Sequence, residues 1–202
     1  PCLKHIIIMD EPAYNQELLS IYTIPNNYKC KWRHRARKST LFIIYTSGTT
    51  GSAKGVPMTS INEVLSAHDV MIHFPMSYKD VTINTTPWFH RGGLHCAGPC
   101  PALYAGATMV IMSKFDALKT LKLVWRYKIT FIIGVPTVLE ALADVQERQG
   151  YDLTALKGIV TMGSPLERSA CIRYQSILTP NIFNGYGTTE TVTACCLTPP
   201  HM

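Results

Sequence analysis

Hydroxyl side chains, glycines and one lysine are concentrated in a single stretch near the first quarter of the chain. It reads Thr46-Ser47-Gly48-Thr49-Thr50-Gly51-Ser52-Ala53-Lys54-Gly55. Glycine lets a backbone approach a ligand closely, and converging N–H groups, hydroxyls and a cation suit a polyphosphate. A Walker A loop would have Gly-Lys-Ser/Thr around the lysine, which is absent here. The stretch therefore predicts a phosphate-binding loop of another design.

A second glycine-rich stretch lies near the end of the chain and reads Asn184-Gly185-Tyr186-Gly187-Thr188-Thr189-Glu190. Its glycines permit close approach of a ligand, and the ring of Tyr186 offers a flat face to a purine. The hydroxyl of Thr189 suits a phosphate, and the carboxylate of Glu190 is a hard oxygen ligand for Mg²⁺. These residue types together indicate a nucleotide site.

Alternating strand and helix patterns must position both stretches. The patterns predict an α/β fold with a largely parallel sheet flanked by helices. We expect strands at 3–9, 41–45, 81–88, 108–112, 130–135, 156–162, 181–186 and 192–197. We expect helices at 59–74, 116–128, 137–149 and 167–178, and a further buried helix after Gly92. The strand at 41–45 is expected to be buried.

Ligands of such sheets bind outside the carboxyl ends of the strands. Both glycine-rich stretches follow expected strands, as do three shorter segments. These are Trp88-Phe89-His90, Gly134-Val135 and Gly163-Ser164-Pro165. We therefore expect all five to meet at one rim of the sheet.

The composition is that of a globular protein. The 202 residues are 47% hydrophobic and 16% charged, enough for one domain with a core. Seven scattered cysteines, an odd number, favour reduced thiols and a cytoplasmic location over a disulfide scaffold. The uncharged run 92–112 contains Gly98, Pro99, Pro101 and Gly106, so we expect buried structure there and no membrane span.

Basic residues are concentrated at 29–38, where six lysines and arginines occur without an acid. One interpretation is a solvated edge strand whose charges prevent aggregation. The other is a contact surface for an anionic ligand, a membrane surface or nucleic acid. The absence of stacking aromatics on the basic face disfavours nucleic acid.

Four potential metal ligands lie close together in the sequence. They are His90, His95, Cys96 and Cys100. Their spacing matches no usual zinc pattern, so we interpret the cysteines as core residues and one histidine as a site residue.

The two glycine-rich stretches, in this order, resemble the nucleotide motifs of the adenylate-forming superfamily. The superfamily includes acyl-CoA synthetases, luciferases and the adenylation domains of peptide synthetases. The segment Gly163-Ser164-Pro165 resembles the part of these proteins that borders adenine. Pro87-Trp88-Phe89-His90 resembles the acyl-pocket segment of acyl-CoA synthetases. The resemblance extends from about residue 41 to 197.

The resemblance implies a two-step ligase reaction. A carboxylate attacks the α-phosphate of ATP to give acyl-AMP and pyrophosphate, and the thiol of coenzyme A then displaces AMP. It implies that the catalytic residues are Lys54, His90, Thr189 and Glu190, with Thr189 on the α-phosphate and Glu190 on Mg²⁺. Trp88, Phe89 and His90 would line the pocket for a fatty or aromatic acid.

The motifs are compatible with more than one activity. Carrier-charging adenylation domains usually have an acidic residue at the position of His90. The histidine at this position favours a substrate without an amine. Luciferase-like oxidation would use the same motifs, and so would a non-catalytic nucleotide-binding or interaction domain. The family's ribose-binding aspartate, hinge arginine and C-terminal lid domain are not found. We therefore expect residues 1–202 to form one incomplete N-terminal domain with little turnover by itself.

Overall fold

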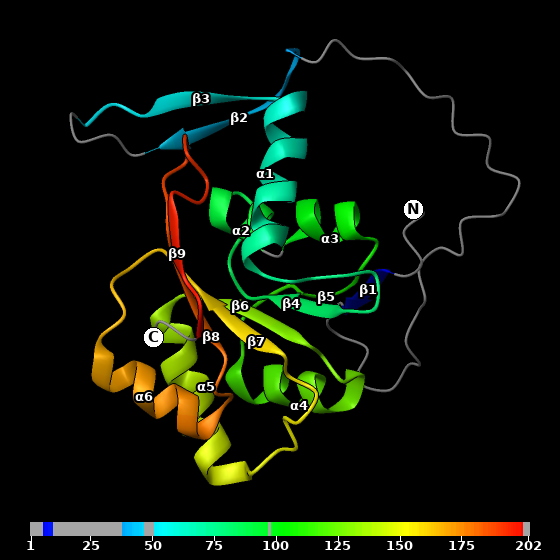
Figure 1. Ribbon diagram of the computed structural model, residues 1–202, viewed down its shortest axis with the longest axis vertical. Helices are drawn as coiled ribbons and strands as arrows, with labels where there is room; N and C mark the ends of the chain where they lie inside the picture. Colours follow the sequence, from blue (N-terminus) through cyan, green and yellow to red (C-terminus); the bar gives the residue numbers. More distant parts are fainter. Residues whose placement is uncertain (1–5, 10–37, 47–50, 97, 200–202) are drawn as a thin grey trace, which may run out of the picture.

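A seven-stranded sheet runs through the protein, for which the computed structural model describes residues 6–9, 38–46, 51–96 and 98–199 (Figure 1). The strand order is β1-β5-β4-β6-β7-β8-β9. The strands are β1 (Ile6–Met9), β4 (Val81–Asn84), β5 (Thr108–Met112), β6 (Phe131–Gly134), β7 (Gly158–Thr161), β8 (Ile182–Tyr186) and β9 (Cys195–Leu197). All neighbours are parallel except β8 and β9. The predicted α/β class with a largely parallel sheet is confirmed.

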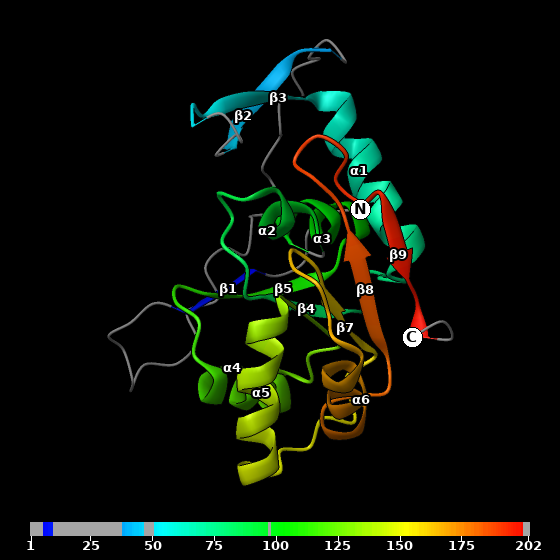
Figure 2. The same ribbon diagram turned by 90° about the vertical axis from the view of Figure 1, so that its left-hand side faces the viewer.

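Helices cover both faces of this sheet. They are α1 (Ser60–His73), α2 (Arg91–His95), α3 (Pro99–Ala105), α4 (Ala117–Tyr127), α5 (Pro136–Gln149) and α6 (Arg168–Ile177). The first three lie on one face and the last three on the other (Figures 1 and 2). The uncharged run after Gly92, expected to hold one buried helix, contains parts of two short ones. No helix in the described part of the chain is long and apolar enough to cross a membrane.

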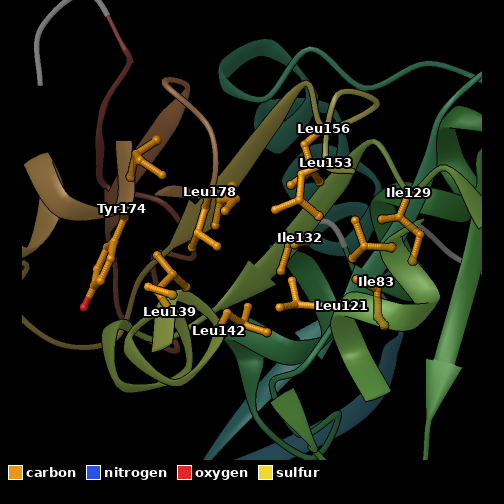
Figure 3. Packing of buried hydrophobic residues seen from close by; sticks show 14 of the residues in the cluster. Ile83, Leu121, Ile129, Ile132, Leu139, Leu142, Leu153, Leu156, Tyr174 and Leu178 are labelled. Carbon is orange, nitrogen blue, oxygen red and sulfur yellow. The ribbon is translucent and has the colours of Figure 1, made fainter. Parts of the chain in front are cut away.

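Alternating side chains of the strands build two cores. Ile132 on β6 joins the core under α4, α5 and α6, which Figure 3 shows. Its neighbours Phe131 and Ile133 face the opposite side, where they pack with Val70 and Phe74 of the α1 region. Successive side chains of a strand point to opposite faces. A sheet buried on both faces therefore needs the continuous apolar runs from which these strands were predicted.

Local signals begin and end the helices on the α4–α6 face. The carboxylate of Asp116 accepts a hydrogen bond from the Lys119 amide at 2.7 Å, which caps α4. Pro136 occupies the first turn of α5, and Gly150 ends it with φ of 62°. The starts of α4 and α5 thus lie just after the carboxyl ends of β5 and β6.

The strand expected to be buried at 41–45 is instead part of a separate hairpin. β2 (Thr40–Thr46) pairs antiparallel with β3 (Lys54–Thr59), a strand that the sequence did not predict. Ile44 is buried, whereas Ile43 is 52% and Tyr45 69% exposed. Among the described residues the hairpin forms its own two-stranded sheet, beside α1 (Figure 1). The prediction of a buried strand was therefore wrong.

Ile61, Val64, Leu65 and Ile72 lie at helical spacings in the sequence, which indicates one apolar face, but α1 buries a different face. Glu63, Ala67 and Val70 are buried, while Val64 and Leu65 are exposed. Periodicity correctly predicted the helix but selected the wrong face. A charged residue thus enters the protein interior at Glu63.

Candidate functional site

A cavity of about 250 Å³ opens at the carboxyl ends of β6, β7 and β8, beside α2. Its lining comes from segments far apart in the sequence. The lining residues are Thr86, His90, Arg91, Gly92, Cys96, Ile133, Gly134, Val135, Met162, Gly163, Gly187, Thr188, Thr189 and Val192. Of the predicted site residues, the cavity brings together His90, Gly134, Val135, Gly163, Gly187, Thr188 and Thr189. The expected meeting of several rim segments is confirmed for this set.

The loop after β8 closes tightly on itself. A Cβ on Gly187 would lie 1.5 Å from the Val192 carbonyl oxygen, so only glycine fits there. The amide of Thr188 donates to the Thr191 hydroxyl at 3.0 Å, and the Val192 amide donates to the Thr188 carbonyl at 2.9 Å. Val192 has φ of 61°, which is strained for a β-branched residue. The loop therefore presents Thr188 and Thr189 to the cavity from a constrained backbone.

The other residues of this motif surround the cavity without lining it. Tyr186 is 63% exposed at the end of β8, so one face of its ring is available to a ligand. Gly185 is buried against Met162, where a Cβ would approach the side chain to 2.9 Å. Asn184 lies within β8 and is half-buried. Gly185 thus has a packing role that its place in a glycine-rich motif did not reveal.

Glu190 is exposed and carries a carboxylate that ionises readily. A hydrogen bond from its own backbone amide lowers its pKa, as do the Thr188 side chain and the positive charge of Lys54. The group is therefore charged at neutral pH. A charged, exposed carboxylate beside hydroxyl groups has the chemistry of a magnesium ligand.

The influence of Lys54 on Glu190 also connects the hairpin with the sheet. Lys54 begins β3 and is exposed, and its backbone carbonyl lies 3.5 Å from the Thr46 hydroxyl of β2. Gly51 has φ of 83°, a conformation that favours glycine. The four central residues of the predicted phosphate loop, Ser47-Gly48-Thr49-Thr50, lie outside the described residues.

His90 stands directly before α2 and caps it. Its Nδ1 accepts a hydrogen bond from the Gly92 amide at 3.1 Å. In a neutral imidazole the other nitrogen, Nε2, then carries the proton. His90 can therefore donate a hydrogen bond from Nε2 to an oxygen of a ligand. Trp88 and Phe89, predicted to line the same pocket, are exposed and lie outside the cavity lining.

Of the predicted segment Gly163-Ser164-Pro165, only the glycine lines the cavity. Gly163 has φ of 94°, and a Cβ there would lie 3.4 Å from Val135. Ser164 and Pro165 are exposed beyond it. Gly163 and Val135 thus form adjoining parts of the same wall.

A buried polar cluster behind the cavity was not predicted from the sequence. The carboxylate of Glu63 contacts Arg91 and His95, and the Cys100 thiol lies 3.8 Å from it. Ligand atoms of Glu63, His95 and Cys100 all lie within 4.8 Å of one another. Burial, then the Glu63 charge, raises the pKa of Cys100 to about 11, and burial raises that of Cys96 to about 12. Both thiols are therefore protonated. Cys96 is a core residue, as interpreted from the sequence, whereas Cys100 is only half-buried.

Asn84 is a second polar residue that the sequence did not reveal. Its side-chain amide donates to the Gly93 carbonyl at 3.0 Å and to the Cys96 carbonyl at 3.2 Å. Its oxygen accepts from the Thr86 amide at 2.8 Å. Asn84 therefore ties the carboxyl end of β4 to α2, although asparagine at a strand end is ordinarily a turn signal.

Known proteins share the sequence pattern and the fold of this chain. The family of AMP-binding enzymes matches residues 2–202, and the chain belongs to it. The chain is 35% identical over 154 residues to indoleacetate–CoA ligase from Aromatoleum aromaticum, covering 76% of this chain and 30% of that protein. It is 37% identical over 163 residues to 4-coumarate–CoA ligase 1 from Petroselinum crispum, covering 76% of this chain and 29% of that protein.

Solved structures of related ligases share the fold. ATP-bound MatB from Rhodopseudomonas palustris has a TM-score of 0.72 at 25% identity, covering 82% of this chain and 32% of that one. O-succinylbenzoate coenzyme A synthetase (MenE) from Bacillus subtilis, in complex with ATP and magnesium ion, has a TM-score of 0.72 at 27% identity. That match covers 82% of this chain and 34% of that one. The chain thus spans about a third of the length of these structures.

Proposed function

We propose that the protein is an ATP-dependent carboxylic acid–CoA ligase. It would form acyl-AMP and pyrophosphate from an acid and ATP, and then transfer the acyl group from AMP to the thiol of coenzyme A. The observation that carries this proposal is the rim cavity, which brings His90 together with Thr188 and Thr189. Lys54 and the ionised Glu190 lie close enough for their charges to interact. Family membership and the CoA ligases among its relatives support it.

The residues present fit ATP with Mg²⁺. Magnesium is usually held by one or two carboxylates together with substrate phosphates, and the exposed, ionised Glu190 supplies one carboxylate. When bound, the ion would neutralise phosphate charge. We assign Thr189 to the α-phosphate, Tyr186 to adenine, and Lys54 with the loop 46–51 to the outgoing pyrophosphate. Asn184, Gly185, Gly187, Thr188 and the segment Gly163-Ser164-Pro165 would border the nucleotide.

These groups would lower the main barrier to the formation of acyl-AMP. A carboxylate and a triphosphate repel each other, so positive charge and preorganised donors must offset the repulsion. Lys54 supplies charge, and the Nε2 proton of His90 would orient the acid carboxylate. His90, Gly134 and Val135 line the cavity and form the proposed acid pocket, whereas Trp88 and Phe89 lie outside its lining and precede His90 in the chain.

The acid that we propose has an aromatic or other apolar group and no amine. Ile133, Val135, Met162 and Val192 give the cavity apolar walls, and no described lining residue is a carboxylate that would pair with an ammonium group. Relatives named for indoleacetate and 4-coumarate support an aromatic acid. This chemistry disfavours amino-acid adenylation.

Acid-dependent exchange of pyrophosphate into ATP tests the proposal. We would assay the protein in its full expressed form with indoleacetate, 4-coumarate, fatty acids of several lengths and a set of amino acids. We expect exchange with an aromatic acid, and thioester formation when coenzyme A is added. Exchange only with amino acids would support carrier-charging chemistry instead, and exchange with no acid would overturn the ligase assignment.

Three further assignments belong to the same proposal. We propose that these 202 residues form part of a larger N-terminal domain, since the matches cover only 30% and 29% of the two curated relatives. We propose a cytoplasmic location, which the five free cysteines of the described residues support. We also propose peripheral membrane contact through the basic run 29–38, of which Lys38 alone belongs to the described residues. Salt-sensitive binding to anionic but not neutral vesicles would test this contact.

A further inference from the structure

Two basic side chains at opposite ends of α2 share one buried carboxylate on α1. Arg91 Nη1 lies 2.5 Å from Glu63 Oε1, and His95 Nε2 lies 2.6 Å from Glu63 Oε2. Arg91 also donates from Nη2 to the Ser66 hydroxyl at 3.1 Å. Arg91 is 4% exposed and His95 is fully buried. Each oxygen of Glu63 thus has its own partner.

The spacing along α2 makes this arrangement possible. Residues four apart lie on the same face of a helix, so Arg91 and His95 both face α1. Burial by itself would raise the pKa of Glu63, but hydrogen bonds from His95 and Arg91 outweigh it and lower the pKa. Glu63 is therefore ionised, and removing its charge would leave Arg91 buried without a carboxylate.

α2 depends on such external contacts for its position. It has five residues, of which two are glycines, so its intrinsic helix stability is low. A Cβ on Gly93 would lie 2.0 Å from the Pro87 carbonyl oxygen, which shows how closely the helix packs on the preceding segment. Asn84 holds it from the sheet side. Glu63 and Ser66 hold it from the side of α1.

The N-terminal end of α2 is also a wall of the cavity. His90, Arg91 and Gly92 all line it, and the Nδ1 contact of His90 depends on the Gly92 amide. Any shift of α2 would therefore move the His90 imidazole, which we propose binds the acid substrate. Glu63 itself does not line the cavity.

We propose that Glu63 is a positioning residue, which acts through Arg91 and His95 to place His90 and Gly92 for binding of the acid. This inference rests on the proposed ligase function. A metal site is the competing interpretation, because Glu63, His95 and Cys100 are close together. The ion pair between Glu63 and Arg91 favours the positioning role, because it occupies one of the two carboxylate oxygens.

The test compares Glu63→Gln, Glu63→Asp and Ser66→Ala with the control Glu147→Gln, an exposed glutamate on α5. In pyrophosphate exchange by the full expressed protein, we expect Glu63→Gln to raise the acid KM about tenfold, as expected for loss of ~1.4 kcal/mol. We expect the ATP KM to change less than about twofold. Glu63→Asp keeps the charge and should recover part of the effect. If Glu63→Gln does not fold, the milder Ser66→Ala still tests the contact between Arg91 and α1.

A second measurement separates this inference from the ligase assignment. The nitrogen NMR signals of the His90 imidazole report its tautomer and surroundings without any substrate. We expect them to shift in Glu63→Gln and Ser66→Ala but not in Glu147→Gln. If these signals move and no acid supports exchange, the ligase assignment alone fails.

Three results would overturn the positioning role. One is an unchanged His90 spectrum and unchanged acid KM in both Glu63→Gln and Ser66→Ala. Another is that Glu63→Gln lowers kcat equally for all substrates and lowers thermal stability, while the ratio of acid KM to ATP KM stays unchanged. The third is stoichiometric zinc in the purified protein that is lost in Glu63→Gln.

Discussion

Individual carboxylates in this protein have different roles because their surroundings differ. Glu190 is exposed and beside Lys54, which suits a site that a metal ion enters from solvent. Glu63 and Asp80 are buried and have fixed partners within the protein. The residue type alone does not distinguish these roles, whereas burial and neighbouring charges do.

Glu190→Gln should remove most Mg²⁺-dependent adenylation. The amide keeps the shape of the side chain but loses the charge that would hold the ion. We expect pyrophosphate exchange to fall by a factor of about 100 or more, with unchanged thermal stability in the absence of ligand. Turnover equal to that of Glu147→Gln would remove Glu190 from the metal role.

Asp80 should make stability depend on pH. Burial would raise its pKa, but Lys157 at 2.7 Å and the Ser77 side chain and amide lower it below the ordinary value of 3.8. A carboxyl whose pKa is lower in the folded state contributes stability above its unfolded pKa. That contribution is lost as the pH falls through the folded pKa, below about 4.

Asp80→Asn should therefore lower the free energy of unfolding by about 1–3 kcal/mol at pH 7. The difference from the wild type should shrink as the pH falls below about 4. Urea unfolding at pH 7 and pH 3 measures both values. The control is Asp69→Asn, a half-exposed aspartate whose nearest basic group, His73, is 3.6 Å away. A difference that stays constant over this range would show that the charge of Asp80 is not involved.

Among the secondary-structure elements, the parallel strands were predictable and the hairpin was not. β6 and β7 are short apolar runs buried on both faces, which leave a clear signal in the sequence. β3 contains Gly55 and Pro57, residues that disfavour strands, and its partner β2 is mostly exposed. Its place depends on pairing with β2, which no local pattern encodes.

The site also contains residues that were predictable from the sequence and residues that were not. The glycine-rich motifs predicted Thr188, Thr189 and His90 near one cavity, because strand order and motif order are both visible in the sequence. Glu63 was missed because a glutamate on a helix is ordinarily solvated. Its partners lie 28 and 32 positions away, a separation that only the packing of α1 on α2 makes close.

Gly187→Ala tests the loop between β8 and β9 as an element. The added Cβ would meet the Val192 carbonyl oxygen, so the loop must open and move Thr188 and Thr189 away from the cavity. We expect the KM for ATP to rise at least about tenfold. Gly150→Ala is the control because open space surrounds Gly150, although its φ of 62° is positive, unlike that of Gly187. Equal kinetics of the two variants would contradict this role of the loop.

At the scale of the whole molecule, several large apolar side chains are exposed on two elements that lie side by side, the hairpin and α1. Exposed apolar side chains occur on the hairpin and on α1, among them Ile43, Val64, Leu65 and Ile72. Large contiguous apolar patches on a protein surface mark contact sites or promote association. The chain also spans only about a third of the length of its solved relatives.

The 202-residue chain alone should therefore self-associate as its concentration rises. Val64→Ser with Leu65→Ser should reduce this association, because both side chains are more than half exposed. Sedimentation velocity over a range of concentrations measures it. The control Trp125→Ser changes an exposed apolar side chain on the opposite face of the sheet. Equal association of the two variants would contradict a role for the α1 surface.

Because the hairpin is separate from the main sheet, we expect it to unfold locally before the main sheet does. An isolated two-stranded hairpin is marginally stable, whereas β6 and β7 lie in the middle of a doubly covered sheet. Backbone amides of β2 and β3 should therefore exchange with deuterium well before those of β6 and β7. If the hairpin holds pyrophosphate, ATP should slow deuterium exchange most in β2 and β3. A uniform change across both sheets would contradict this role of the hairpin.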